Sequence, residues 1–176
     1  MVKEKVKAVI DSSFWININK VNLARYLLDY FSLYSTDKVR EELLDHKKKE
    51  LYTSKDAELF QSLMDAELII SKNPQEISLK FKQNLSNDSG EIYTIALAKE
   101  ISAVVLADDK SAINFCRNQK ILVITSPYFL VWLCESGKIS PEICYLKIIQ
   151  LKEKVNKTHI NSALADLEKV KINGRI

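Results

Sequence analysis

The stretch Ala103-Val104-Val105-Leu106-Ala107-Asp108-Asp109 decides the fold class. Its five apolar residues follow one another without a polar interruption. Such a run is typical of a β-strand covered on both faces, as in parallel sheets flanked by helices. A second, mainly apolar stretch, Val6-Lys7-Ala8-Val9-Ile10, lies near the amino terminus and is also followed by an aspartate, Asp11. We therefore expect two buried strands with carboxylates at their carboxyl ends.

Segments around these two strands alternate between strand-like and helical patterns. Further strands are expected at residues 31–34, 67–71 and 121–124, the last of them buried. One helix is expected to begin at residue 36, and others are expected at residues 54–64, 74–85, 89–99 and 110–118. Ser126-Pro127 and Ser140-Pro141 each combine a capping serine with proline at the first helical position, which predicts two more helix starts. Because parallel crossovers join alternating strands and helices, the sequence predicts an α/β fold. We expect a three-layer α/β/α sandwich with a central, mainly parallel sheet.

Composition narrows the class of protein further. The 176 residues are enough for one domain with a core, and 47% hydrophobic residues exclude a disordered chain. Only 3 glycines and 3 prolines argue against an all-β protein with many tight turns. The net charge of +3 permits an RNA partner without establishing one. Cys116, Cys134 and Cys144 have no zinc-binding spacing and are expected to be buried and reduced.

The ends of the chain predict location and domain organisation. No apolar stretch of the signal-peptide kind precedes the first strand, and no apolar run approaches a membrane span, so we expect a cytoplasmic protein without a membrane partner. Residues 1–140 are expected to form the main domain, and residues 141–176 a C-terminal helical extension packed on it. In this tail Ile160, Leu164, Leu167 and Val170 recur at helical spacing. Docking of the tail to a partner protein or to a second copy is the alternative.

Five acidic residues stand where an open parallel sheet binds ligands, beyond the carboxyl ends of its strands. They are Asp11, Glu42, Glu91, Asp108 and Asp109. The three aspartates directly follow the two decisive strands, and the two glutamates lie near the starts of helices. If the strands are neighbours, the carboxylates converge in one cleft. Asn17 and Asn19, which come after the first aspartate, are minor candidates for lining it.

Carboxylates that converge repel one another unless a cation neutralises them. Mg²⁺ or Mn²⁺ is the natural cation because hard cations prefer oxygen ligands, and such a site can activate water and stabilise charge on a phosphodiester. Glu42 and Glu91 also have a structural interpretation, since acidic residues near helix starts complement the helix dipole, and Asp108 or Asp109 can cap the next helix. Asp11 is harder to explain in this way, because it directly follows an apolar run. Ser12 and Ser13 offer hydroxyls suited to the same capping role after the first strand. The residues alone predict metal-dependent phosphoryl chemistry without naming a substrate.

Four motifs, in this order along the chain, resemble those of the PIN-domain nucleases, particularly the branch related to the ribonuclease toxins of toxin–antitoxin pairs. They are Val9-Ile10-Asp11-Ser12-Ser13, Val39-Arg40-Glu41-Glu42-Leu43, Asp88-Ser89-Gly90-Glu91-Ile92 and Leu106-Ala107-Asp108-Asp109-Lys110. The resemblance spans roughly residues 6 to 140. It implies an α/β/α sandwich and a metal-dependent endoribonuclease that hydrolyses RNA phosphodiester bonds.

The resemblance also implies roles for individual residues. The catalytic, metal-holding set is Asp11, Glu42, Glu91 and Asp108 or Asp109, with Mg²⁺ or Mn²⁺ as cofactor. Ser12 or Ser13 would orient Asp11 or the substrate phosphate, and Lys110 is the nearby basic residue for positioning substrate. The implied partners are single-stranded or structured RNA, an antitoxin protein and a second copy of the chain.

Two other classes of function are open at this stage. A non-catalytic PIN-like module that binds RNA or protein is the runner-up, because Tyr93 occupies a position where the family often has a second helix acid. A phosphotransfer enzyme with a nucleophilic Asp11 is less favoured, since Ser13 stands where a haloacid-dehalogenase-like phosphatase needs a second aspartate. A response-regulator receiver is poorly supported as well, because no acidic pair precedes the strand that carries Asp11.

Overall fold

A parallel sheet forms the centre of the computed structural model, which describes residues 5–48, 54–78, 81 and 89–173. Within these residues the strands follow the order β3-β2-β1-β4-β5, and every neighbouring pair is parallel. Their bounds are β1 (Val6–Ile10), β2 (Phe31–Ser35), β3 (Ile69–Ser71), β4 (Val104–Leu106) and β5 (Val123–Ile124). The strand order reverses between β1 and β4, which pair through Val9 opposite Val105 and Ile10 opposite Leu106. This reversal is the point at which open α/β sheets bind ligands.

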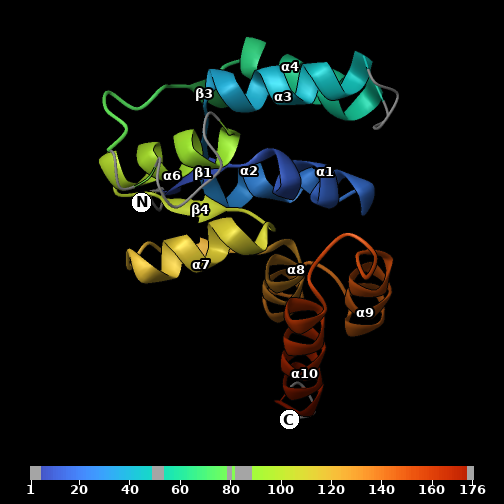
Figure 1. Cartoon of the computed structure of the whole chain (residues 1–176). Helices are drawn as coiled ribbons and strands as arrows, with labels where there is room; N and C mark the ends of the chain where they lie inside the picture. The colour runs from blue at the N-terminus through green and yellow to red at the C-terminus, as the bar shows by residue number, and fades with distance from the viewer. Residues whose placement is uncertain (1–4, 49–53, 79–80, 82–88, 174–176) are drawn as a thin grey trace.

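Helices connect the strands and cover the sheet (Figure 1). Their bounds are α1 (Ser12–Lys20), the short 3-10 helix η1 (Ala24–Tyr26), α2 (Leu27–Tyr30), α3 (Asp37–Lys48), α4 (Ser54–Asp65), α6 (Gly90–Glu100), α7 (Lys110–Asn118), α8 (Ser126–Glu135), α9 (Pro141–Gln150) and α10 (Lys157–Asn173). Helical and strand segments therefore alternate as the sequence predicts.

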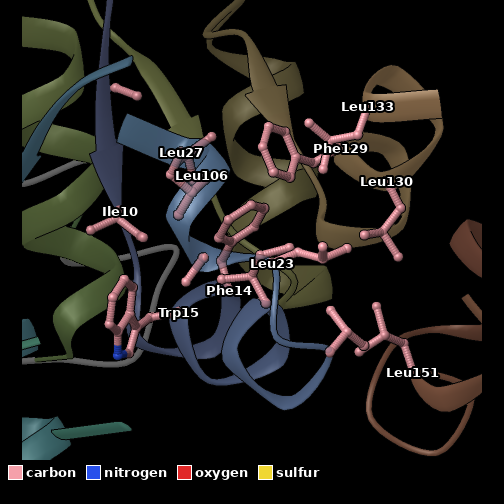
Figure 2. Packing of buried hydrophobic residues seen from close by; sticks show 14 of the residues in the cluster. Ile10, Phe14, Trp15, Leu23, Leu27, Leu106, Phe129, Leu130, Leu133 and Leu151 are labelled. Carbon is pink, nitrogen blue, oxygen red and sulfur yellow. The ribbon is translucent and has the colours of Figure 1, made fainter. Parts of the chain in front are cut away.

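The sheet has an apolar cluster on each face because successive side chains of a strand point to opposite sides. Ile10 and its neighbour on β4, Leu106, join a large cluster with Phe14 and Phe129, as Figure 2 shows. Val9 belongs instead to a second cluster with residues of α6 and α7. The predicted three-layer α/β/α arrangement is confirmed by this division.

The last three helices pack against one another and gather on the side of the molecule away from α3 and α4 (Figure 1). Ile148 of α9 and Leu167 of α10 are fully buried in the same cluster as Phe14. Leu151, which follows α9, also lies in this cluster, near Leu130 (Figure 2). The tail from residue 141 to the end of α10 therefore contributes to the core of the sheet domain.

Two predicted elements differ from the structure. The strand expected to be buried at residues 121–124 is reduced to β5, which is half-buried, and Leu122 beside it is 64% exposed. β5 is the edge of the sheet, so only one side of it pairs with another strand. The helix expected at residues 74–85 is absent over residues 74–78, which are irregular. Of the rest of that range, only Phe81 belongs to the described residues, and it is helical.

Cys116, Cys134 and Cys144 are buried and not paired in disulfides, as expected. Within the described ranges, no helix is both long and apolar enough to cross a membrane.

Candidate active site

The three predicted aspartates lie together at the carboxyl ends of β1 and β4. The backbone N–H of Asp11 donates to the carbonyl of Leu106 at 2.9 Å, which holds the two strand ends side by side. Ser13 connects them further, because its hydroxyl donates to Asp11 Oδ2 at 2.6 Å and accepts from the Asp108 N–H at 3.2 Å. The strand order thus places Asp11 next to the paired aspartates.

Asp11 is only 2% exposed and acts as the N-cap of α1. Its Oδ2 accepts hydrogen bonds from the N–H and the hydroxyl of Ser13, at 3.2 and 2.6 Å. Its Oδ1 is buried without a hydrogen-bond partner. Burial and, to a smaller extent, the nearby Glu42 carboxylate together raise the pKa of Asp11 to about 6, against the lowering effect of the hydrogen bonds from Ser13. A buried carboxylate oxygen without a hydrogen-bond donor destabilises the fold unless a cation or a proton satisfies it.

The predicted capping role of Ser12 and Ser13 is wrong, because Asp11 itself holds the cap position. The Ser12 hydroxyl instead donates to Glu42 Oε2 at 3.0 Å, and Ser13 binds Asp11. Aspartate is an equally good N-cap residue, and the helix begins one residue earlier than a serine cap would allow. Both hydroxyls are consequently available to orient acidic side chains.

Glu42 joins α3 to the first turn of α6. Its Oε1 accepts from the Gly90 N–H at 2.6 Å, and its Oε2 accepts from Ser12. A Cβ at position 90 would lie 2.6 Å from Oε2 and 2.9 Å from Cδ of Glu42. Only glycine at this position lets the carboxylate sit against the backbone at the start of α6.

Glu91 follows directly in the first turn of α6 and is half-buried. Burial, the largest cause, and the charges of Asp109, Asp11 and Glu42 together raise its pKa to about 7. Glu91 Oε2 lies 3.1 Å from the Ser111 hydroxyl oxygen. These mutual effects show that four of the five predicted carboxylates share one electrostatic environment.

Asp109 is the member of the aspartate pair that faces this group. Its Oδ1 caps α7 by accepting from the N–H and hydroxyl of Ser111, each at 2.6 Å, and from the Ala112 N–H at 3.1 Å. Burial raises the pKa of Asp109, but these hydrogen bonds outweigh it, and the pKa is lowered overall. Asp109 therefore stays ionised beside Glu91.

Asp108 points to different neighbours. Both of its oxygens are engaged: Oδ1 accepts from the Ser126 N–H at 2.7 Å, and Oδ2 accepts from the Ser126 hydroxyl at 2.6 Å and from Asn17 Nδ2 at 2.7 Å. Its side chain is 5% exposed, and burial raises its pKa. Asp108 thus ties the end of β4 to the start of α8 and to α1.

Polar residues that hold these carboxylates carry only weak signals in the sequence. Asn17 is buried on α1, next to apolar Ile18, and a polar residue on an apolar helix face is the available clue. Asn19, the other minor candidate, donates to the Trp15 carbonyl and stays within its own helix. Ser126 is predicted as a helix cap, but Thr125 holds that position and Ser126 binds Asp108. Ser111, between Asp109 and Glu91, has no sequence signal beyond its place in the first turn of α7.

Whether these residues suit a divalent cation is tested by their donor atoms. Among the described residues, no group of three or more acidic, histidine or cysteine side chains already stands at metal-binding spacing. The chemistry of the set nevertheless fits Mg²⁺ or Mn²⁺. It consists of carboxylates, and Asp11 Oδ1 is buried without a donor. Repulsion among Asp11, Glu42, Glu91 and Asp109 is the kind of energetic cost that a bound cation removes.

Comparison with known proteins agrees with this geometry. A search of curated proteins finds no match. A family model described as a PIN domain matches residues 7–169, from the second residue of β1 to near the end of α10. Since the match covers both strand ends, all five acidic residues and most of the C-terminal helices, the chain belongs to the PIN-domain family.

Proposed function

We propose that this chain is a metal-dependent endoribonuclease whose active residues are Asp11, Glu42, Glu91 and Asp109. Proteins of the PIN-domain family are generally nucleases, which supports hydrolysis of phosphodiester bonds. The observation that carries the proposal is the group of four mutually repelling carboxylates at the strand-order reversal. Mg²⁺ or Mn²⁺ bound there supplies charge neutralisation for the phosphodiester and activation of water.

The residues of the chain have separate tasks in this proposal. Asp11 and Glu91 carry the buried or half-buried charge that attracts the cation. Ser12 and Ser13 hold Glu42 and Asp11 through their hydroxyls, so the carboxylates are oriented before substrate arrives. Asp108 holds the backbone of this region in place through Ser126 and Asn17 and is a positioning residue.

The test is cleavage of a mixed single-stranded RNA pool by purified protein with Mn²⁺, with Mg²⁺ or with a chelator. Asp11→Asn removes the buried charge and keeps the shape of the side chain. Asp29→Asn is the matched control, because Asp29 is exposed on α2, before β2 begins. We expect metal-dependent cleavage by the wild type and by the control, and none by Asp11→Asn. Cleavage by Asp11→Asn at the wild-type rate would refute the proposed site, and single-stranded DNA of the same sequence tests the choice of RNA.

A non-catalytic module that binds RNA or protein is the second candidate, and Tyr93 is the observation that favours it. Tyr93 is half-buried and packs against the cluster beneath α6. It stands in the first half of that helix, where it provides no second carboxylate for a metal ion. This candidate predicts RNA binding in chelator and no cleavage with any of the metals.

A role as the toxin of a toxin–antitoxin pair is a finer proposal that rests on the resemblance of the four motifs. It predicts that induced expression of the wild type arrests bacterial growth and that expression of Asp11→Asn does not. It also predicts that a small protein encoded beside the gene relieves the arrest. Growth unaffected by an active enzyme would remove the toxin role and leave the nuclease.

A further inference from the structure

A polar pocket of about 300 Å³ lies beside the acidic residues. Ser13 and Asn17 of α1 line it together with the stretch 108–110 at the start of α7. Its remaining lining residues are Lys154 and Asn156, which come from the connection between α9 and α10. The pocket therefore joins the candidate site to the C-terminal part of the chain.

The connection that carries Lys154 is fixed to the core on both sides. Leu151 is fully buried and Val155 is 5% exposed, and both belong to the large apolar cluster. The N–H groups of Lys154 and Val155 each donate to the Leu151 carbonyl at 3.0 Å, which closes a tight turn. Asn156 ends this turn, and its Oδ1 caps α10 by accepting from the Thr158 N–H at 2.9 Å. The backbone of Lys154 is thus held in a defined place at the pocket.

Two lysines and two aspartates are the charged residues that line the pocket. Lys110 and Lys154 are exposed, and in the described part of the chain neither forms an ion pair. The Asp108 carboxylate, although it borders the pocket, already accepts three hydrogen bonds from Ser126 and Asn17. Asp109 is engaged through Oδ1 with the start of α7. Two ammonium groups therefore remain to donate to an incoming ligand.

We propose that Lys110 and Lys154 form a subsite for the RNA phosphate that flanks the scissile phosphodiester. The proposal rests on the proposed nuclease function, because Ser13 and Asp109 belong both to this pocket and to the acidic site. An RNA chain that reaches the acidic residues from this side would cross the pocket. Its phosphate oxygens can accept hydrogen bonds from lysine. Lys154 adds to the sequence-predicted Lys110 a contact from a segment far along the chain.

The experiment compares Lys154→Ala and Lys154→Arg with Lys152→Ala. Lys152 lies in the same turn and is exposed, but it does not line the pocket. Binding of fluorescently labelled single-stranded RNA is measured in chelator over a series of salt concentrations, and cleavage kinetics are measured separately with Mn²⁺. Melting temperatures establish that each variant is folded.

We expect Lys154→Ala to weaken RNA binding several-fold and to lower the slope of log Kd against log salt by about 0.7, the value for one phosphate contact on a single strand. KM is expected to rise while kcat changes little, because the contact binds ground state and transition state alike. Lys154→Arg should keep the wild-type slope, since the charge remains, and Lys152→Ala should behave as the wild type.

Each outcome separates this inference from the proposed function. Cleavage by the wild type with equal salt slopes for Lys154→Ala and Lys152→Ala would overturn the subsite and leave the nuclease. A slope that depends on Lys154 in a protein that never cleaves RNA would support the subsite and overturn the catalytic assignment. Absence of RNA binding in chelator together with absence of cleavage with Mn²⁺ would overturn both, and an acidic protein would then be the partner to test for the two lysines.

Discussion

Asp108 and Asp109 are adjacent in sequence and have opposite surroundings. Asp109 faces Glu91 and caps α7, and asparagine is also a good cap residue. We expect Asp109→Asn to leave the free energy of unfolding within about 0.5 kcal/mol of the wild type and to reduce metal-dependent cleavage severely. Urea unfolding and initial cleavage rates measure the two effects.

Asp108→Asn is expected to lower the free energy of unfolding and to leave metal-dependent cleavage intact. The amide has one acceptor oxygen where the carboxylate has two, so the three hydrogen bonds from Ser126 and Asn17 cannot all be kept as they are, and loss of one costs about 1–3 kcal/mol. Cleavage well below the melting temperature should persist, because the four carboxylates of the proposed active site are unchanged. If Asp108→Asn abolishes cleavage without loss of stability, and Asp109→Asn does not, the two assignments must be exchanged.

Gly90 gives a way to displace Glu42 without altering it. In Gly90→Ala the new Cβ would overlap the Glu42 carboxylate, which is the end of a flexible side chain and can move away at small cost to stability. A displacement of about 1 Å in an active site can cost about a hundredfold in rate, and we expect a loss of that order for cleavage. Alanine suits a helix, so the melting temperature should change little. Glu42→Gln is the companion variant, and full activity of Gly90→Ala would show that the close contact is not needed.

The raised pKa values of Asp11 and Glu91 determine how the stability of the metal-free protein varies with pH. The pKa of Asp11 rises from 3.8 to about 6, and that of Glu91 from 4.5 to about 7. Between about pH 4 and pH 7 the folded chain therefore binds more protons at these groups than the unfolded chain does. Because the folded chain binds more protons, the contribution of Asp11 and Glu91 to the free energy of unfolding falls as pH rises through this window.

We expect the melting temperature of Asp11→Asn in chelator to exceed that of the wild type at pH 7.5, and the difference to shrink toward pH 4.5. Added Mn²⁺ at pH 7.5 should raise the melting temperature of the wild type more than that of Asp11→Asn, because the cation relieves the buried charge. Scanning fluorimetry over pH measures both effects. A wild type that melts at the higher temperature at pH 7.5 in chelator would contradict the argument.

At the scale of elements, regular patterns predict most of the structure. The apolar runs before Asp11 and Asp108 predict β1 and β4, and the range predicted for α7 agrees with its observed bounds. Caps are harder to predict, because serine and aspartate satisfy the same N–H groups and only the tertiary contacts decide between them. Ser126 illustrates this point: its hydroxyl binds a buried carboxylate of another element instead of its own helix.

The burial of a strand at the sheet edge also cannot be predicted from the local sequence pattern. The apolar residues 121–124 resemble a central strand, but their exposure depends on whether another strand follows beyond β5. The convergence of the acidic residues has the same origin, since it requires β1 and β4 to be neighbours. The sequence identifies the five carboxylates, but the separation of Asp108 from the other four follows from side-chain contacts that sequence spacing does not contain.

At the scale of the whole molecule, α9 and α10 share the core of the sheet domain, and this arrangement predicts a single unfolding transition. Leu167 of α10 is fully buried in the cluster that contains Ile10. We expect Leu167→Ala to lower the free energy of unfolding by about 2–5 kcal/mol, because it leaves a cavity. Leu146→Ala on α9 is the control, since Leu146 is 60% exposed and should change stability little.

In each variant, intrinsic fluorescence from Trp15 and Trp132 and helical circular dichroism should give the same midpoint as each other. Two separate transitions, with only the smaller one shifted by Leu167→Ala, would show that the C-terminal helices unfold as a unit of their own.

The pairing of β1 with β4 has a consequence in time as well as in space. A ribosome finishes Asp11 and Glu42 early, but Leu106, whose carbonyl receives the Asp11 N–H, leaves it much later. Contacts between such distant segments form late and slowly in folding. A nascent chain therefore carries Asp11 and Glu42 without the neighbouring strand end until β4 has been made, and the group of carboxylates can assemble only after that point.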